Sequence, residues 1–306
     1  MTLKWWLGIV LLFFSNVAIL LNVLIFMPVF RLAFSSKKSS VYIIAFFNII
    51  TDIWFLLMLL LYLSPSIMLD SFINGSEADS VSSVIIGGIW FTAWHMECLT
   101  QVVMATNRLV IITLRKYTVF TYRFTMFAYF LVFMCAVTTV IFDQTVFPCC
   151  RFIMDHRFLS FSFINPDNEY NYSNFVLMCY NLFATFAPTI CYSIVFIQIR
   201  MAGAKVASSI SQDKKKQDIR YLVQFVFISI FYIFTWIFFE LCPLIVPSGN
   251  AEWYIVVPIL VCFNSSSNSV IYLSVNREVQ RTVPITWLRK RLSKSAPSSN
   301  VIAIAI

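Results

Sequence analysis

Residues 6–30, "WLGIVLLFFSNVAILLNVLIFMPVF", contain no Asp, Glu, Lys or Arg. An α-helix needs about 20 mostly apolar residues to cross the hydrocarbon core of a bilayer, and this stretch is long enough to do so. A cleavable signal peptide is not expected, because the apolar run is too long and no small-residue cleavage site follows it. We therefore predict that the stretch is a retained membrane-spanning helix.

Six further apolar runs of similar length follow this one. The seven expected spans are residues 6–30, 41–64, 84–113, 124–147, 174–199, 220–246 and 253–275. Strands of a membrane barrel need only about 9–11 alternating residues, so the length of the runs favours helices. The chain is 60% hydrophobic and 12% charged, against about 25% charged in ordinary soluble domains. We predict an all-α membrane protein, a bundle of seven transmembrane helices over residues 1–275, with a basic tail over residues 276–306.

The positions of the basic residues indicate the orientation of the bundle. If the N-terminus is outside, only Lys4, Arg151 and Arg157 of the 22 Lys and Arg residues fall on the outer side. Cytoplasmic loops of membrane proteins carry the excess of Lys and Arg. We therefore expect the N-terminus outside, the C-terminus and its tail in the cytoplasm, and a multi-pass protein of the plasma membrane. The same rule explains the net charge of +8 without a nucleic-acid partner.

Polar residues occur at similar depth in four of the expected helices. They are Asn22, Asp52, Glu97, Asn264 and Ser265. A charged group inside a span costs about 2.5–3.5 kcal/mol on insertion scales, so such groups usually face the bundle interior. We expect a polar core, which is either ordinary interhelical hydrogen bonding or a hydrated switch site. Two carboxyl groups in a low dielectric repel, so at least one is expected to be protonated or to share a monovalent cation at Asp52. No other metal and no cofactor is expected.

The outer segments carry cysteines and two glycosylation sequons. Cys149, Cys150 and Cys242 lie at outer helix ends, where they are positioned to oxidise, but the sequence leaves their pairing open. Asn74-Gly-Ser and Asn171-Tyr-Ser are N-glycosylation sequons in expected outer loops. Both agree with the orientation inferred from the basic residues.

Four motifs occur in an order and spacing typical of one receptor family. They are "ATNRLVIITLRKY" at residues 105–117, "PCC" at 148–150, "KKKQDIRYLVQ" at 214–224 and "SVNREVQR" at 274–281. With its seven helices, the chain resembles a rhodopsin-type G-protein-coupled receptor, and best the nematode serpentine chemoreceptors of the Srx group. The similarity covers nearly the whole chain. It implies a receptor, not an enzyme, that binds a small-molecule ligand and signals through a heterotrimeric G protein.

The resemblance also implies a set of residues that switch the receptor on. They are Asn107, Arg108, Asp218, Trp236, Asn268 and Tyr272. Arg108 matches the arginine that joins helix three to helix six in resting receptors and meets the G protein in active ones, and Asp218 falls where its acidic partner would be. Asn107 departs from the family pattern, because the usual residue there is an acid. The alternative role for Arg108 is an anchor whose charged end reaches the membrane surface.

Aromatic residues near the outer end of the third expected helix suggest a ligand pocket. Trp90, Phe91 and Trp94 lie there, and the resemblance places Phe239 and Glu240 of the sixth helix opposite them. Such a stripe is either plain core or the wall of a pocket for a small, largely apolar molecule held mainly by burial. No acid stands at Trp90, where amine receptors carry one, so a biogenic amine is not expected.

Other classes of membrane protein fit the sequence less well. A transporter would show inverted repeats and broken helices, and we find no internal repeat. "HMEC" at residues 95–98 is not the His-Glu-x-x-His motif of zinc enzymes. A ligand-gated channel of seven helices remains an alternative. After the seventh helix we expect a short amphipathic segment along the inner membrane surface, with Val279 and Val283 facing lipid.

Overall fold

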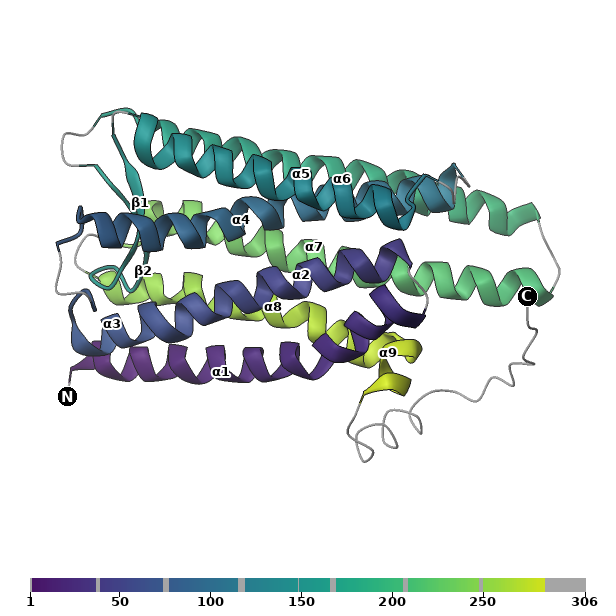
Figure 1. Ribbon diagram of the computed structural model, residues 1–306, viewed down its shortest axis with the longest axis horizontal. Coiled ribbons are helices and arrows are strands. Elements are labelled where there is room, and N and C mark those ends of the chain that lie inside the picture. The colour runs from purple at the N-terminus through teal and green to yellow at the C-terminus, as the bar shows by residue number, and fades with distance from the viewer. Residues whose placement is uncertain are drawn as a thin grey trace.

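The computed structural model describes residues 2–36, 39–73, 77–114, 119–147, 149–165, 169–205, 209–247 and 250–283. Within them, seven long helices run side by side along a common axis (Figure 1). These are α1 (Leu3–Phe30), α2 (Ser40–Met58), α4 (Val81–Arg108), α5 (Tyr122–Ile141), α6 (Tyr172–Lys205), α7 (Ser209–Ile245) and α8 (Val256–Val275). The predicted seven-helix bundle is therefore confirmed, whereas its orientation in the membrane stays a prediction.

Shorter helical segments extend five of these helices. α2 continues through a π-helical segment, Leu59–Leu63, into the short helix α3 (Ser64–Leu69), and a 3-10 segment, Ala251–Ile255, leads into α8. Further π-helical segments extend α1, α4 and α5 over Arg31–Ser36, Leu109–Thr113 and Phe142–Val146.

Five helical segments of the described chain are long and apolar enough to cross a membrane by themselves. They are Leu3–Ser35, Ser40–Leu69, Tyr122–Val146, Tyr172–Gln198 and Ala251–Ser274. The sides of these helices that face away from the bundle expose large apolar side chains, as contact with lipid requires. In α1, for example, Phe13 is 62% exposed and Leu20 is 69% exposed. Among the described residues, α7 contributes a shorter apolar stretch, Ser229–Ile245.

The remaining helix, α4, is the centre of the bundle. It packs against α2, α5, α6 and strand β1, and its side chains are buried without interruption from Trp90 to Cys98. Because lipid touches so little of α4, polar residues such as His95 and Glu97 are tolerated on it when they find partners on neighbouring helices.

A β-hairpin lies across the end of the bundle where α1 begins, which is called the outer end after the predicted orientation, although the sequence predicted no strand there. Strands β1 (Arg151–Asp155) and β2 (Ser160–Ile164) pair antiparallel, with Arg151 opposite Ile164. Figure 1 shows them beside the outer ends of α3 and α4. The alternation Ser160-Phe161-Ser162-Phe163 is the period-two signal of a strand.

The hairpin is fastened to the bundle at Phe152 of β1. Gln144 Nε2 donates to the Phe152 carbonyl at 2.9 Å, and the Phe152 N–H donates to Gln144 Oε1 at 3.0 Å. The backbone of α4 comes so close that a Cβ at Gly87 would collide with the backbone of Phe152 and Ile153. Glycine is thus required at this position for packing between α4 and β1.

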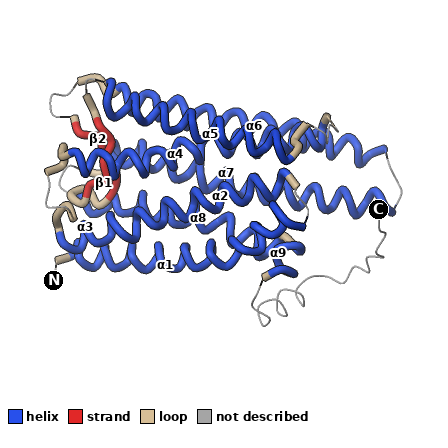
Figure 2. Tube along the Cα trace, in the orientation of Figure 1, coloured by secondary structure: helices blue, strands red, loops and turns tan. Residues whose placement is uncertain are grey.

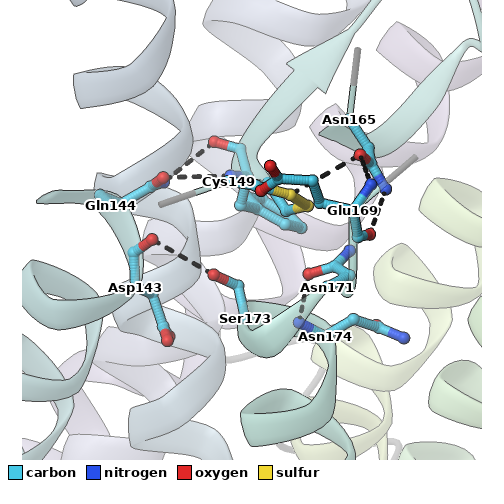
Figure 3. Close-up of a disulfide and its surroundings, with 10 residues drawn as sticks. Asp143, Gln144, Cys149, Asn165, Glu169, Asn171, Ser173 and Asn174 are labelled. Atoms are coloured by element: carbon cyan, nitrogen blue, oxygen red, sulfur yellow. Dashed lines mark hydrogen bonds between the residues drawn. A yellow bond between two sulfur atoms is a disulfide. The ribbon is translucent and has the colours of Figure 1, made fainter. Parts of the chain in front are cut away.

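The structure joins Cys149 and Cys150, neighbours in sequence, in a disulfide (Figure 3). Figure 3 shows the bridge beside Asn165 and Glu169, where Cys149 Sγ lies 3.6 Å from Asn165 Oδ1. Cys242, the third candidate, is a buried free thiol. The bridge is therefore local and does not tie the outer loop to another helix.

A short helix, α9 (Arg277–Thr282), turns across the inner end of the bundle (Figure 2). It begins where Asn276 Oδ1 accepts hydrogen bonds from the N–H groups of Glu278 and Val279. Val279 and Val283 are buried in an apolar cluster with residues of α1 and α2, so the expectation that they face lipid is wrong. Residues 284–306, most of the predicted tail, lie outside the described part of the chain.

Candidate functional site

Asp52 of α2 is the centre of a buried polar core. Its carboxylate is fully buried, and Oδ2 accepts hydrogen bonds from Asn268 Nδ2 of α8 at 2.8 Å and from Asn48 Nδ2 at 3.3 Å. Glu97 of α4 lies close enough to interact electrostatically with Asp52, and its Oε1 accepts from Gln101 Nε2 at 2.8 Å. The structure thus brings the two carboxyl groups together, as expected.

Asn22 extends this core to α1. Its Nδ2 donates to the carbonyl of Ser265 at 3.0 Å, and Ser269 Oγ donates to its Oδ1 at 2.8 Å. Asn264 and Ser265 are both buried on the same turn of α8. The Ser269 hydroxyl thereby contributes a link between α1 and α8.

The hydrogen bonds of the polar core are incomplete. Among the described residues, several buried oxygens have no hydrogen-bond partner: Asp52 Oδ1, Glu97 Oε2, Asn48 Oδ1, Gln101 Oε1 and Asn264 Oδ1. Buried oxygens normally find a donor or an ordered water. Water molecules, a shared proton or a small cation bound by oxygen ligands would satisfy this cluster.

At the inner end of α4, Arg108 lies inside the bundle. It is only 6% exposed and lies near Tyr192 of α6. Asn107 Nδ2 donates to Ser40 Oγ at the start of α2, at 3.2 Å. The side chain of Asp218 on α7 lies outside the described part of the chain, so its pairing with Arg108 stays a prediction. Burial of Arg108 argues against a lipid-facing anchor.

The other residues assigned to the switch lie along α7 and α8. Trp236 Nε1 donates to Thr185 Oγ1 of α6 at 3.1 Å. Asn268 bonds Asp52, and Tyr272, one turn further along α8, is buried in an apolar cluster with Tyr42 of α2. The Asn-x-x-x-Tyr stretch therefore connects the polar core to the inner end of the bundle.

The predicted pocket near the outer end of α4 is largely filled by the hairpin. The ring of Phe152 stacks on Phe91 with centroids 4.4 Å apart, and Phe161 stacks on Trp90 at 4.0 Å. Trp90, Phe91, Trp94 and Phe239 do line one common space, which we call the aromatic cavity, but its volume is only about 10 Å³. That is about enough for one water molecule.

A larger cavity adjoins the aromatic cavity and shares Phe161, Phe239 and Val257 with it. This outer cavity has a volume of about 280 Å³. Its lining also includes Phe158, Ser160, Ser162, Phe163, Asn171, Asn174, Glu240, Pro243 and Tyr254. The predicted ligand residues are thus divided between two cavities, with Glu240 on the outer one.

The structure adds two candidate site residues that the sequence did not single out, Asn181 of α6 and Tyr232 of α7. Asn181 Oδ1 accepts from Trp94 Nε1 at 3.0 Å and from the Tyr232 hydroxyl at 2.8 Å. All three side chains are buried. The signal was present, because an amide and a phenol inside apolar spans need partners, but sequence could not show that both meet Trp94.

A second buried pair, His95 and Asp143, also joins neighbouring helices. His95 Nε2 lies 4.0 Å from Asp143 Oδ2, and His95 Nδ1 is 2.9 Å from the Phe91 carbonyl. Both side chains are almost completely buried. The sequence alone did not indicate a role for this pair.

Of the two sequons, Asn171 lies within the described residues and Asn74 lies outside them. Asn171 is half-buried at the start of α6, where its Oδ1 accepts from the N–H of Asn174 at 2.8 Å (Figure 3). Glycosylation at both positions stays a prediction.

Comparison with known proteins gives one family and one fold. The family profile described as "Serpentine type 7TM GPCR chemoreceptor Srx" matches residues 12–276, most of the chain. The crystal structure of squid rhodopsin is similar, with a TM-score of 0.70 and 15% sequence identity over 97% of this chain and 91% of that chain. At this identity the likeness concerns the fold alone. No curated protein matches the sequence.

Proposed function

Because the chain belongs to the Srx family of serpentine seven-transmembrane G-protein-coupled chemoreceptors, we propose that it binds a small molecule in the outer half of the bundle and signals through a heterotrimeric G protein. It is a multi-pass membrane protein and not an enzyme. The observation that carries the proposal is that buried polar groups recur along the length of the bundle: the Trp94–Asn181 pair, the Asp52–Asn268 pair and Arg108.

The ligand site of this proposal comprises Trp90, Phe91 and Trp94 of α4 with Phe239 and Glu240 of α7. All five residues line either the aromatic cavity or the outer cavity, which supports their assignment to the ligand site. A ligand that enters the aromatic cavity must displace Phe152 or Phe161, because these rings occupy its space. Movement of the hairpin is therefore required for a ligand to reach Trp90, Phe91 or Trp94, but not for one that stays in the outer cavity.

The switch of this proposal has two parts. In the polar core, Asp52 and Glu97 share a proton or bind a monovalent cation with Asn22, Asn264 and Ser265. Support comes from the buried oxygens of the core that have no hydrogen-bond partner among the described residues. At the inner end, Arg108 pairs with Asp218 in the resting receptor and turns to the G protein in the active one.

For localisation we propose the plasma membrane, with the N-terminus outside. In that orientation Asn74 and Asn171 face the compartment where glycosylation occurs, and residues 276–306 form a cytoplasmic tail. Most Lys and Arg residues then lie on the inner side, as the positive-inside rule requires.

Receptor function is tested by G-protein activation in cells that express the full chain. Basal nucleotide exchange above that of untransfected membranes is expected at high expression, and Arg108→Ala should reduce it to the level of those membranes. Arg123→Ala, a change in another basic residue near the inner side, serves as the control. Exchange that is no higher than background, while the chain conducts ions or moves solutes, would favour the channel or transporter alternative.

A further inference from the structure

The outer cavity differs from the aromatic cavity in its lining. Five aromatic residues surround it: Phe158, Phe161, Phe163, Phe239 and Tyr254. Within the described part of the chain, Glu240 is the one charged residue among its lining residues. Its volume, about 280 Å³, is close to the lower end of the range of about 300–1,000 Å³ for small-molecule pockets.

The carboxyl group of Glu240 has few partners in this cavity. Glu240 is half-buried near the outer end of α7, and the Asn174 amide is its polar neighbour. Its Oε1 has no hydrogen-bond partner among the described residues, and no described Lys or Arg lines the cavity. A partly buried carboxylate without a compensating charge is unfavourable, and a bound cation would stabilise its ionised form.

We propose that the outer cavity binds an organic cation, an ammonium group placed against Glu240 with an apolar body among the surrounding rings. Aromatic ring faces attract cations by their quadrupole, so the rings and the carboxylate act on the same charge. The inference rests on the proposed receptor function and names the class of ligand.

This placement differs from the one considered in the sequence analysis. There, the absence of an acid at Trp90 of α4 argued against amine ligands. In the structure the acid comes from α7, above the space that Phe152 and Phe161 fill. An organic cation therefore reaches Glu240 without displacing Phe152, whose ring does not line the outer cavity.

The test uses the full-length receptor purified in dodecyl maltoside, an uncharged detergent that lacks ammonium groups. The probes are benzyltrimethylammonium and neopentylbenzene, which have the same shape because a carbon replaces the charged nitrogen. The cation should bind at least about tenfold more tightly than the hydrocarbon. Glu240→Gln should bring the two affinities within about threefold of each other, whereas the control Glu252→Gln, in the segment before α8, should keep the preference.

Folding of Glu240→Gln is checked by its thermal transition and by its binding of neopentylbenzene. If this variant does not fold, Tyr254→Leu replaces it, because loss of one ring should weaken binding of the cation more than binding of the hydrocarbon. Equal affinities in the wild-type chain, no binding of either probe, or a preference that survives Glu240→Gln would each overturn the proposal. None of these results affects the Arg108 test of G-protein activation, so the two failures are distinguishable.

Discussion

At the scale of single residues, Asp52 joins three helices of the bundle. It accepts a hydrogen bond from Asn268 of α8 and lies beside Glu97 of α4. Asp52→Asn keeps the size of the side chain, but an amide can neither share a proton with Glu97 nor contribute a negative charge to a cation site. Ligand-free G-protein activation should therefore change by at least about threefold, while surface expression stays largely intact.

The control for this prediction is Asp70→Asn, which removes an exposed carboxylate that pairs with Lys4 at the outer surface. It should leave activation unchanged. If Asp52→Asn also signals like the parent at matched surface expression, the polar core acts only as interhelical hydrogen bonding.

Arg108 gives the second prediction at this scale. Its proposed partner, Asp218, would hold α4 to α7 in the resting state, because an arginine–carboxylate pair is matched in charge and geometry. Solvent and the neighbouring Lys214–Lys216 run should weaken the pair, so we expect about a tenfold change in the population of the active state. Asp218→Ala should raise ligand-free second-messenger output accordingly.

Asp213→Ala, on the same helix, is the matched control and should not raise this output. An Asp218→Ala variant that is no more active than the parent at equal surface expression would show that the resting-state pair does not exist. Arg108 would then act only by contact with the G protein.

At the scale of elements, two adjacent glycines of α4 provide a matched pair of tests. A Cβ at Gly87 would strike the backbone of Phe152, whereas one at Gly88 would meet Val140 and Gln144 at ordinary contact distances. Gly87→Ala should lower stability by about 1–3 kcal/mol through overpacking. Gly88→Ala should be neutral or stabilise by up to about 1 kcal/mol, because alanine favours helix.

Thermal unfolding of the two purified variants under identical conditions measures this difference. A Gly87→Ala receptor as stable as Gly88→Ala would mean that β1 does not sit against α4 as the structure has it.

The hairpin also supplies a prediction about pH. His156, in the turn between β1 and β2, packs its ring against Phe72, and burial lowers its pKa from 6.5. When folding lowers the pKa of a base, the unfolded chain takes up the proton more readily, so protonation favours unfolding. Stability should therefore be complete above about pH 6.5 and fall as the pH drops below it. His156→Gln should remove this part of the pH dependence, as seen in melting temperatures between pH 7.5 and pH 5.

The elements differ in how well the sequence predicted them. The helices followed from runs such as residues 6–30, because a span needs only length and apolarity. Burial of Asp52, Glu97 and Asn264 also followed, since the cost of a polar group in lipid forces it inward. The hairpin was missed although Ser160–Phe163 alternates as a strand does, because β1 shows no such alternation and its contact with Gln144 cannot be read from sequence. Val279 was assigned to lipid because an apolar side chain suits either lipid or the bundle.

At the scale of the whole molecule, the orientation of the bundle is the open prediction. With only three basic residues on the proposed outer side, Lys4, Arg151 and Arg157, we expect an N-terminal epitope tag to be stained on intact cells. A C-terminal tag should be stained only after permeabilisation. A C-terminal tag visible on intact cells would overturn the orientation and, with it, coupling to a cytoplasmic G protein.

The central position of α4 has a consequence for how the receptor is made. α4 is not among the five described helical segments apolar enough to cross a membrane by themselves, because it carries polar residues such as Glu97 and His95. In the finished bundle these residues face protein. During synthesis, however, α4 leaves the translocon before α5, α6 and α8 exist. α1 and α2 are then the only helices available to shield it, so we expect efficient insertion of α4 to depend on the two hydrophobic helices that precede it. Loss of either should leave α4 outside the bilayer and the nascent chain open to quality control.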